Sequence, residues 1–186
     1  MKDNIHTLIL PDIHGRLFWK SAIDLFSKDE YPDLKIIFLG DYLDPYPSLE
    51  NISKTDAIFN FEKIIEYAKN DDRIILLLGN HDFHYIYHND DCRIDRKNFD
   101  YIRNLFINYK SLFKIAYEEN INDITYLYTH AGITDGWYTH IKNLGNFMQA
   151  NPRLSENDKL WAKEFMINFK PTSYYLNKFL NNSFRI

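Results

Sequence analysis

Three short apolar runs in this 186-residue chain each end in a polar loop that contains a glycine. They are residues 8–10, 36–39 and 74–78, and the first two are followed by amphipathic stretches with helical spacing. Runs of this length without alternation are typical of strands that are buried on both faces of a sheet. Their order therefore predicts strand–loop–helix units and an α/β fold.

Further helix and turn signals extend this pattern. The stretch 17–26 is amphipathic, and Ser53 is the predicted N-cap of a second helix. The apolar face of that second helix consists of Ala57, Ile58, Phe61, Ile64, Ile65 and Ala68. Residues 113–117 and 124–128 predict two more strands, and the turn-prone residues 118–123 allow them to pair as a hairpin.

The whole chain, residues 1–186, is expected to form one domain. No Gly/Ser linker, repeat or low-complexity tract divides it, and 45% hydrophobic residues provide enough material for a core. The expected architecture is a mixed β-sheet core flanked by helices on both faces. Residues 134–186 predict a helical segment in which Ser155 is a cap.

Composition gives no sign of a nucleic-acid or membrane partner. The net charge is -4 and Lys and Arg form no long run, so charge indicates neither a nucleic-acid nor a membrane surface. No apolar run approaches the roughly 18 residues of a membrane span. The single cysteine, Cys92, cannot form an internal disulfide, and the apolar run near Met1 is too short for a signal sequence. We therefore expect a cytoplasmic protein.

Residue types that bind metals follow four of the predicted strands. The carboxyl edge of the strands is where ligands bind to an open α/β sheet. At these ends the sequence places Asp12, His14, Asp41, Asn80, His81 and His130. Oxygen and imidazole ligands together suit divalent or trivalent transition metals. Asp41 is the natural bridge, because one carboxylate can join two ions about 3.5–4 Å apart.

The strand ends form four ordered motifs, which are Asp12-Ile13-His14-Gly15, Gly40-Asp41-Tyr42-Leu43-Asp44, Gly79-Asn80-His81-Asp82 and Thr129-His130-Ala131-Gly132. In this order they resemble the motifs of calcineurin-like metallophosphoesterases. The resemblance is closest to the phosphoprotein phosphatase and diadenosine-tetraphosphatase branches. It covers residues 8–133 and implies the fold of that superfamily, with metals at the carboxyl edge of the strands.

The resemblance implies two divalent or trivalent metal ions, with Mn, Fe or Zn as the expected metals. Asp12 and His14 would hold the first ion, and Asp41 would bridge the two. Asn80 and His130 would hold the second ion. Two such ions lower the pKa of a water that they share, so that hydroxide exists near neutral pH.

The same resemblance makes His81 a general acid or charge stabiliser beside the leaving-group oxygen, with Asp44 orienting its ring. Asn80 is expected to contact the substrate phosphate as well as a metal. Phosphatases of the first branch continue the second motif with a phosphate-binding arginine, whereas this chain has Pro45 after Asp44. Arg16 is the candidate substitute, because a guanidinium can hold two phosphate oxygens at once.

A late Gly-His motif, which supplies one or two further histidines in the family, has no counterpart in this chain. The only histidine after His130 is His140. Three explanations remain open: the chain is a truncated form, His140 compensates, or the second metal site is weak. Truncation is favoured, because the family's sheet normally needs later strands and this chain would then be C-terminally incomplete.

These residues predict a hydrolase that cleaves a phosphomonoester or a phosphoanhydride by attack of a metal-bridging hydroxide. The expected substrate is a phosphorylated small molecule, a nucleotide or a phosphoprotein, since the low density of Lys and Arg disfavours long nucleic acid. The alternative is a non-catalytic or weakly active metal- or phosphate-binding module. An exposed sheet edge in an incomplete fold would also allow a homodimer.

Overall fold

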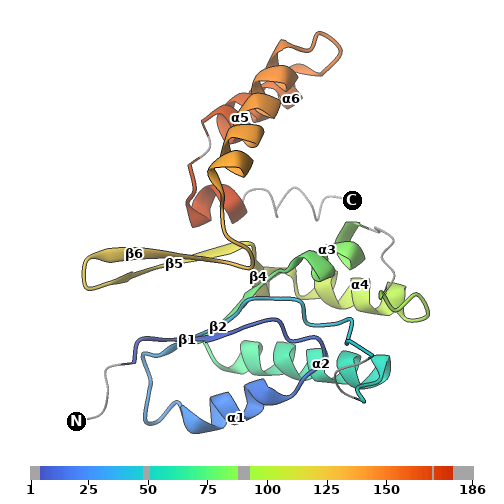
Figure 1. The fold of residues 1–186 in the computed structure, drawn as a ribbon, viewed down its shortest axis with the longest axis vertical. Helices are drawn as coiled ribbons and strands as arrows, with labels where there is room; N and C mark the ends of the chain where they lie inside the picture. Colours follow the sequence, from blue (N-terminus) through green and yellow to red (C-terminus); the bar gives the residue numbers. More distant parts are fainter. Residues whose placement is uncertain (1–4, 48–50, 88–92, 169, 178–186) are drawn as a thin grey trace.

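A four-stranded parallel sheet forms the centre of the computed structural model, which describes residues 5–47, 51–87, 93–168 and 170–177. The sheet has the order β1-β2-β3-β4 (Figure 1). Its strands are β1 (Thr7–Leu10), β2 (Lys35–Phe38), β3 (Ile74–Leu77) and β4 (Phe113–Lys114). The three predicted apolar runs are therefore neighbouring strands, and their carboxyl ends meet at one edge. The predicted α/β class, with helices flanking the sheet, is confirmed, but the central sheet is parallel rather than mixed, because the antiparallel strand pair lies in a separate sheet.

Helices α1 (Phe18–Leu25) and α2 (Lys54–Asn70) lie on the same face of this sheet (Figure 1). The predicted N-cap of α2 is confirmed: the Ser53 hydroxyl accepts a hydrogen bond from the Asp56 backbone N–H, and the Asp56 carboxylate accepts one from the Ser53 N–H. The predicted apolar face of α2 is buried against the sheet, with Ala68 half-buried at its end.

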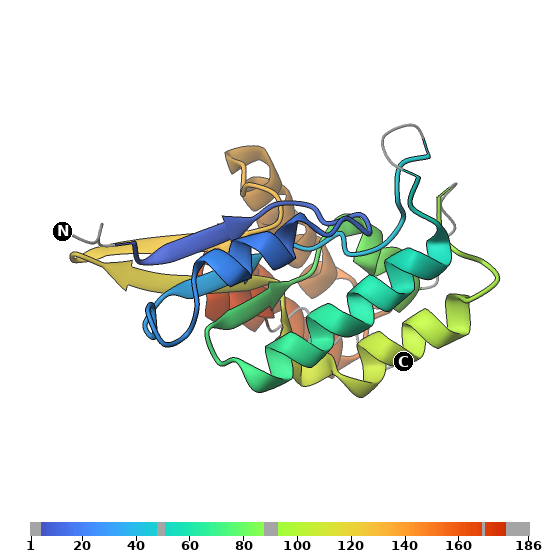
Figure 2. The same ribbon diagram turned by 90° about the horizontal axis from the view of Figure 1, so that it is seen from below.

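The segment between β3 and β4, which the sequence left without assigned elements, contains two helices. They are α3 (Asn80–Tyr87) and α4 (Phe99–Asn108). Helix α4 lies beside α2, as both ribbon views show (Figures 1 and 2), and the rings of Phe61 and Phe106 join the two helices at 4.8 Å between centroids. Cys92 falls outside the described residues.

An aromatic cluster connects this core to the second motif. Tyr42, which directly follows Asp41, stacks on Phe61 with a centroid distance of 5.1 Å. Its hydroxyl donates a 2.7 Å hydrogen bond to the Leu77 carbonyl at the end of β3. Aromatic pairs of this geometry add to the energy of simple burial. The residue beside the predicted bridging ligand is thus anchored among aromatic rings of the core.

The predicted hairpin forms, but its first strand begins later than expected. Strands β5 (Ala116–Ile121) and β6 (Ile124–Thr129) pair antiparallel around a turn in which Asn122 and Asp123 have positive φ. Phe113 and Lys114 instead pair in parallel with β3, because the Phe113 ring packs into the core cluster. The chain bends at Ile115, where the Asn177 side chain accepts the backbone N–H of residues 115 and 116.

The predicted helical segment contains α5 (Asp135–Ala150), α6 (Glu156–Trp161) and a π-helical stretch, Ala162–Ile167. Figure 1 shows α5 and α6 extending away from the parallel sheet. Ser155 caps α6 as predicted, since its side chain accepts the Asp158 backbone N–H. Residues 173–177 are helical, and residues 178–186 lie outside the described part. Within the described ranges, no helix combines the length and apolar character needed to cross a membrane.

The capping box at Ser53 gives a stability prediction. Replacing Ser53 with Ala leaves the Asp56 N–H without its side-chain acceptor, so we expect the free energy of unfolding in urea to fall by about 1 kcal/mol. Thr55→Ala, an exposed substitution in the same first turn, is the matched control and should not destabilise. Equal unfolding midpoints for Ser53→Ala and wild type would contradict the role of this cap.

Candidate metal centre

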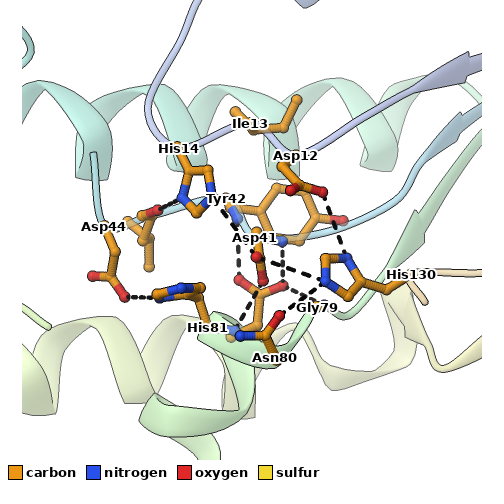
Figure 3. A network of polar contacts seen from close by, with 12 residues as sticks. Asp12, Ile13, His14, Asp41, Tyr42, Asp44, Gly79, Asn80, His81 and His130 are labelled. Carbon is orange, nitrogen blue, oxygen red and sulfur yellow. Dashed lines mark hydrogen bonds and ion pairs between the residues drawn. The ribbon is translucent and has the colours of Figure 1, made fainter. Parts of the chain in front are cut away.

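Four loops bring the predicted site residues together at the carboxyl edge of the sheet (Figure 3). The loops after β1 and β2 are joined by successive backbone hydrogen bonds, from the Ile13 N–H to the Gly40 carbonyl at 3.4 Å, from the His14 N–H to the Asp41 carbonyl at 2.7 Å and from the Gly15 N–H to the Tyr42 carbonyl at 2.9 Å. The loop after β6 lies at the same edge, where Nδ1 of the His130 ring forms a hydrogen bond with the Leu39 carbonyl at the end of β2.

Two glycines allow the loops after β2 and β3 to approach each other. A Cβ at Gly40, whose φ is +107°, would lie 2.3 Å from the Gly79 nitrogen. A Cβ at Gly79 would lie 2.1 Å from Asp41 Oδ1. Both positions therefore require a residue without a side chain.

A buried carboxylate fixes the same two loops. Asp82 is fully buried, and its oxygens accept the backbone N–H groups of Asp41 at 2.9 Å, Tyr42 at 3.1 Å and Gly79 at 2.8 Å. Burial raises the pKa of Asp82 well above its usual value and the charge of Asp41 adds to that rise, whereas the three N–H donors oppose it. The sequence showed Asp82 at the end of the third motif, but its role depends on contacts across two loops.

Three predicted site residues have a left-handed backbone. The φ angles are 44° at His14, 52° at Asp41 and 60° at Asp44. This region is unfavourable for residues with a side chain, and such strain is concentrated at functional sites. In Figure 3 the His14 and Asp41 side chains face each other, and the Asp44 side chain points to the His81 ring.

Asp12, His14 and Asp41 form a candidate metal-ligand group, with one potential ligand atom from each residue within 4.8 Å of the others. The His14 Nδ1–H donates to the Leu43 carbonyl at 2.9 Å, so Nε2 of the neutral ring keeps its lone pair. Burial lowers the pKa of His14, which favours this neutral form. Its Nε2 lies 3.8 Å from Asp41 Oδ2.

A second group of potential ligands meets on the other side of Asp41. The His130 Nδ1 lies 2.9 Å from the Leu39 carbonyl, which can only accept, so Nε2 of the neutral ring carries the lone pair. This Nε2 lies 3.0 Å from Asn80 Oδ1 and 3.7 Å from Asp41 Oδ2. This 3.0 Å contact is satisfied by a cation shared between the two acceptors, by a proton on the ring, or by rotation of the Asn80 amide so that its NH2 group donates.

Asp41 Oδ2 thus lies between two imidazole nitrogens that both point toward it. The donor set of carboxylate, amide oxygen and imidazole fits divalent transition metals. The structure brings together all five residues predicted as metal ligands, namely Asp12, His14, Asp41, Asn80 and His130. His140 is exposed on α5 and belongs to no group of potential ligands within the described residues.

His81 and Asp44 form a pair beside these ligands. The His81 Nδ1 lies 3.0 Å from Asp44 Oδ2, and the Tyr85 hydroxyl donates to Asp44 Oδ1 at 2.5 Å. The hydrogen bond to Asp44 raises the pKa of His81, and burial of the ring opposes that rise. This geometry directs Nε2 of His81 away from Asp44.

Two arginines lie near the centre. The Arg16 guanidinium donates to the backbone carbonyls of Ile13, at 3.1 Å, and Asp12. Arg93, which the sequence analysis did not select, contacts Nε2 of His81. No motif marks Arg93, because it follows the third motif after an intervening helix and reaches the centre only through the tertiary fold.

Comparison with known proteins identifies a family. The family model described as "Metallophos: Calcineurin-like phosphoesterase" matches residues 5–184. No curated protein and no solved structure matches the chain.

The contacts of Asp82 predict the effect of its removal. In Asp82→Asn, the amide nitrogen faces backbone N–H donors instead of accepting from them, so one or two of these donors lose their partner. We expect the free energy of unfolding to fall by about 1–3 kcal/mol, together with weaker Mn²⁺ binding in equilibrium dialysis. Asp29→Asn, at an exposed position, is the matched control. Unchanged stability and Mn²⁺ affinity in Asp82→Asn would show that the carboxylate does not hold the loops.

Proposed function

Because the chain belongs to the calcineurin-like phosphoesterase family, we propose that it hydrolyses a phosphomonoester or a phosphoanhydride with the help of two metal ions. The observation that carries the proposal is the position of Asp41 Oδ2, 3.8 Å from His14 Nε2 and 3.7 Å from His130 Nε2. A carboxylate oxygen between two imidazole lone pairs suits a bridging ligand. The substrates considered are a phosphorylated small molecule, a nucleotide and a phosphoprotein.

Asp12 and His14 would hold the first ion, Asn80 and His130 the second, and Asp41 both. Two divalent ions, when bound in this way, supply hydroxide near neutral pH and neutralise charge on the phosphoryl oxygens. The backbone contacts of His14 and His130 keep the ring tautomers that metal binding requires. Manganese is the ion we would supply first.

His81 would protonate the leaving group. Hydroxide forms the new bond to phosphorus, the bond from phosphorus to the leaving oxygen breaks, and the proton on Nε2 of His81 passes to that oxygen. Asp44 accepts from Nδ1 and stabilises the protonated ring, while Tyr85 holds Asp44 in place. No covalent phosphoenzyme forms in this scheme. Asn80 and Arg16 are the residues proposed to contact the phosphate.

The two roles of Asp41 and His81 give different expected losses. Asp41→Asn should lose bound Mn²⁺ and hydrolysis together, whereas His81→Ala should keep the metal and lose about 10²–10⁴-fold in kcat. The loss in His81→Ala should be greater for phenyl phosphate than for p-nitrophenyl phosphate, because phenolate is the more basic leaving group. The measurements are elemental analysis and steady-state kinetics.

His140→Ala is the matched control and should behave as wild type in both assays. Two outcomes would contradict the proposal: hydrolysis that survives Asp41→Asn, and a wild-type protein that binds Mn²⁺ but hydrolyses neither ester. The second outcome would favour a non-catalytic metal- or phosphate-binding module.

The raised pKa of His81 predicts a pH dependence. The protonated ring is the acid, so kcat should fall as the pH rises through this pKa. Asp44→Asn replaces the carboxylate that accepts the His81 hydrogen bond, the main cause of the raised pKa, with a neutral amide, so the alkaline limb of the pH profile should move to lower pH. An alkaline limb at the same pH in Asp44→Asn and wild type would exclude His81 as its source.

Arg16 has its own test. If its guanidinium leaves the backbone carbonyls of Asp12 and Ile13 to hold phosphate, Arg16→Ala should raise KM about tenfold or more while Mn²⁺ content stays constant. Loss of metal in this variant would instead assign Arg16 to shaping the first-motif loop.

A further inference from the structure

The backbone that directly follows Arg93 is fixed to the core and to the candidate centre. Ile94 is 6% exposed and belongs to the main hydrophobic cluster. Its carbonyl accepts a 2.7 Å hydrogen bond from the Lys54 ammonium. The Asp95 N–H donates at 2.8 Å to the Tyr85 hydroxyl, which in turn donates to Asp44. Arg93 therefore begins from an anchored backbone, although it lies between helices α3 and α4.

The Arg93 side chain lies across the His81–Asp44 pair. Its Nη1 donates to the Asp44 carbonyl at 3.2 Å, and Nη2 contacts Nε2 of His81. The guanidinium also lies over the Tyr46 ring, 3.9 Å from its centroid, and the Tyr46 ring packs edge-on against His14 at 4.8 Å. The positively charged Arg93 side chain thus lies between His81, the proposed acid, and Tyr46, whose ring contacts His14.

The contact with His81 is the one that substrate would replace. Asp44 accepts from Nδ1 of His81, so in the neutral ring Nε2 accepts from Arg93. A neutral imidazole nitrogen is a weaker partner for guanidinium than a charged phosphoryl oxygen, to which Arg can donate two parallel hydrogen bonds. The Arg93 guanidinium already contacts Nε2 of His81. A phosphoryl group that places its leaving oxygen against this nitrogen would therefore also lie within reach of Arg93.

We propose that Arg93 binds a charged oxygen of the substrate phosphoryl group, and that this binding releases Nε2 of His81 toward the leaving oxygen. The inference rests on the proposed function. It differs from the assignment of Arg16, whose guanidinium donates to carbonyls of its own loop. Arg93 approaches from the side of the acid, and Arg16 from the side of the first motif.

The direct test is the binding of inorganic phosphate, measured by titration calorimetry with and without Mn²⁺. Arg93→Ala should weaken phosphate binding about 10- to 100-fold, as expected for a hydrogen bond between charged groups. Arg93→Gln retains side-chain donors without the charge, so it should fold as wild type and show a comparable loss. Arg93→Lys keeps a charge and should recover part of the affinity. Arg153→Ala, at an exposed arginine between α5 and α6, is the matched control.

Kinetics of phenyl phosphate hydrolysis separate this inference from the proposed function. Arg93→Gln should raise KM with Mn²⁺ content unchanged. Phosphate affinity within twofold of wild type in both Arg93→Ala and Arg93→Gln would overturn the role of Arg93, even if the wild type hydrolyses the ester. Phosphate binding that depends on Arg93 in a wild type without hydrolysis would support the anion site and overturn the enzyme proposal. Failure of the wild type to bind phosphate would overturn the role of Arg93.

Discussion

The hydrogen bonds of Asp82 hold together the part of the structure on which the candidate centre depends. Its carboxylate accepts N–H groups from the loops after β2 and β3 and thereby fixes Asp41 relative to Gly79. The Asp41 side chain then accepts the His81 N–H at 2.9 Å, which positions the start of α3. A buried, fully hydrogen-bonded carboxylate makes such a connection rigid, because losing any partner leaves a buried polar group unsatisfied.

Rigid loops explain how the sheet edge tolerates strained backbone. His14, Asp41 and Asp44 have left-handed φ angles, which are uncommon for residues with a side chain and persist where neighbouring contacts determine them. The surrounding contacts are specific: three backbone hydrogen bonds join the first two loops, and Gly40 packs directly on Gly79. The parallel sheet supplies the common edge, and these contacts turn the side chains inward from it.

The sequence predicted features that depend on local pattern and could not predict those that depend on tertiary contact. Apolar runs and the polar residues after them predicted the strands and the convergence of Asp12, Asp41 and Asn80, because the parallel strands β1, β2 and β3 share one carboxyl edge. His130 follows the antiparallel strand β6, and its ring reaches this edge at the Leu39 carbonyl. The hairpin boundary was misplaced, since burial of the Phe113 ring in the core decides where the chain leaves the sheet. Arg93 was missed for the same reason: it lies beside His81, and the residues that anchor the backbone after it, Ile94 and Asp95, do so through tertiary contacts.

The central claim is a pair of metal ions that share Asp41, and anomalous diffraction from crystals grown with Mn²⁺ tests it most directly. A dinuclear centre predicts two anomalous peaks on either side of Asp41 Oδ2, one next to Nε2 of His14 and the other next to Nε2 of His130. A single peak, or peaks that do not contact Asp41, would contradict the bridging role and with it the proposed hydrolytic centre.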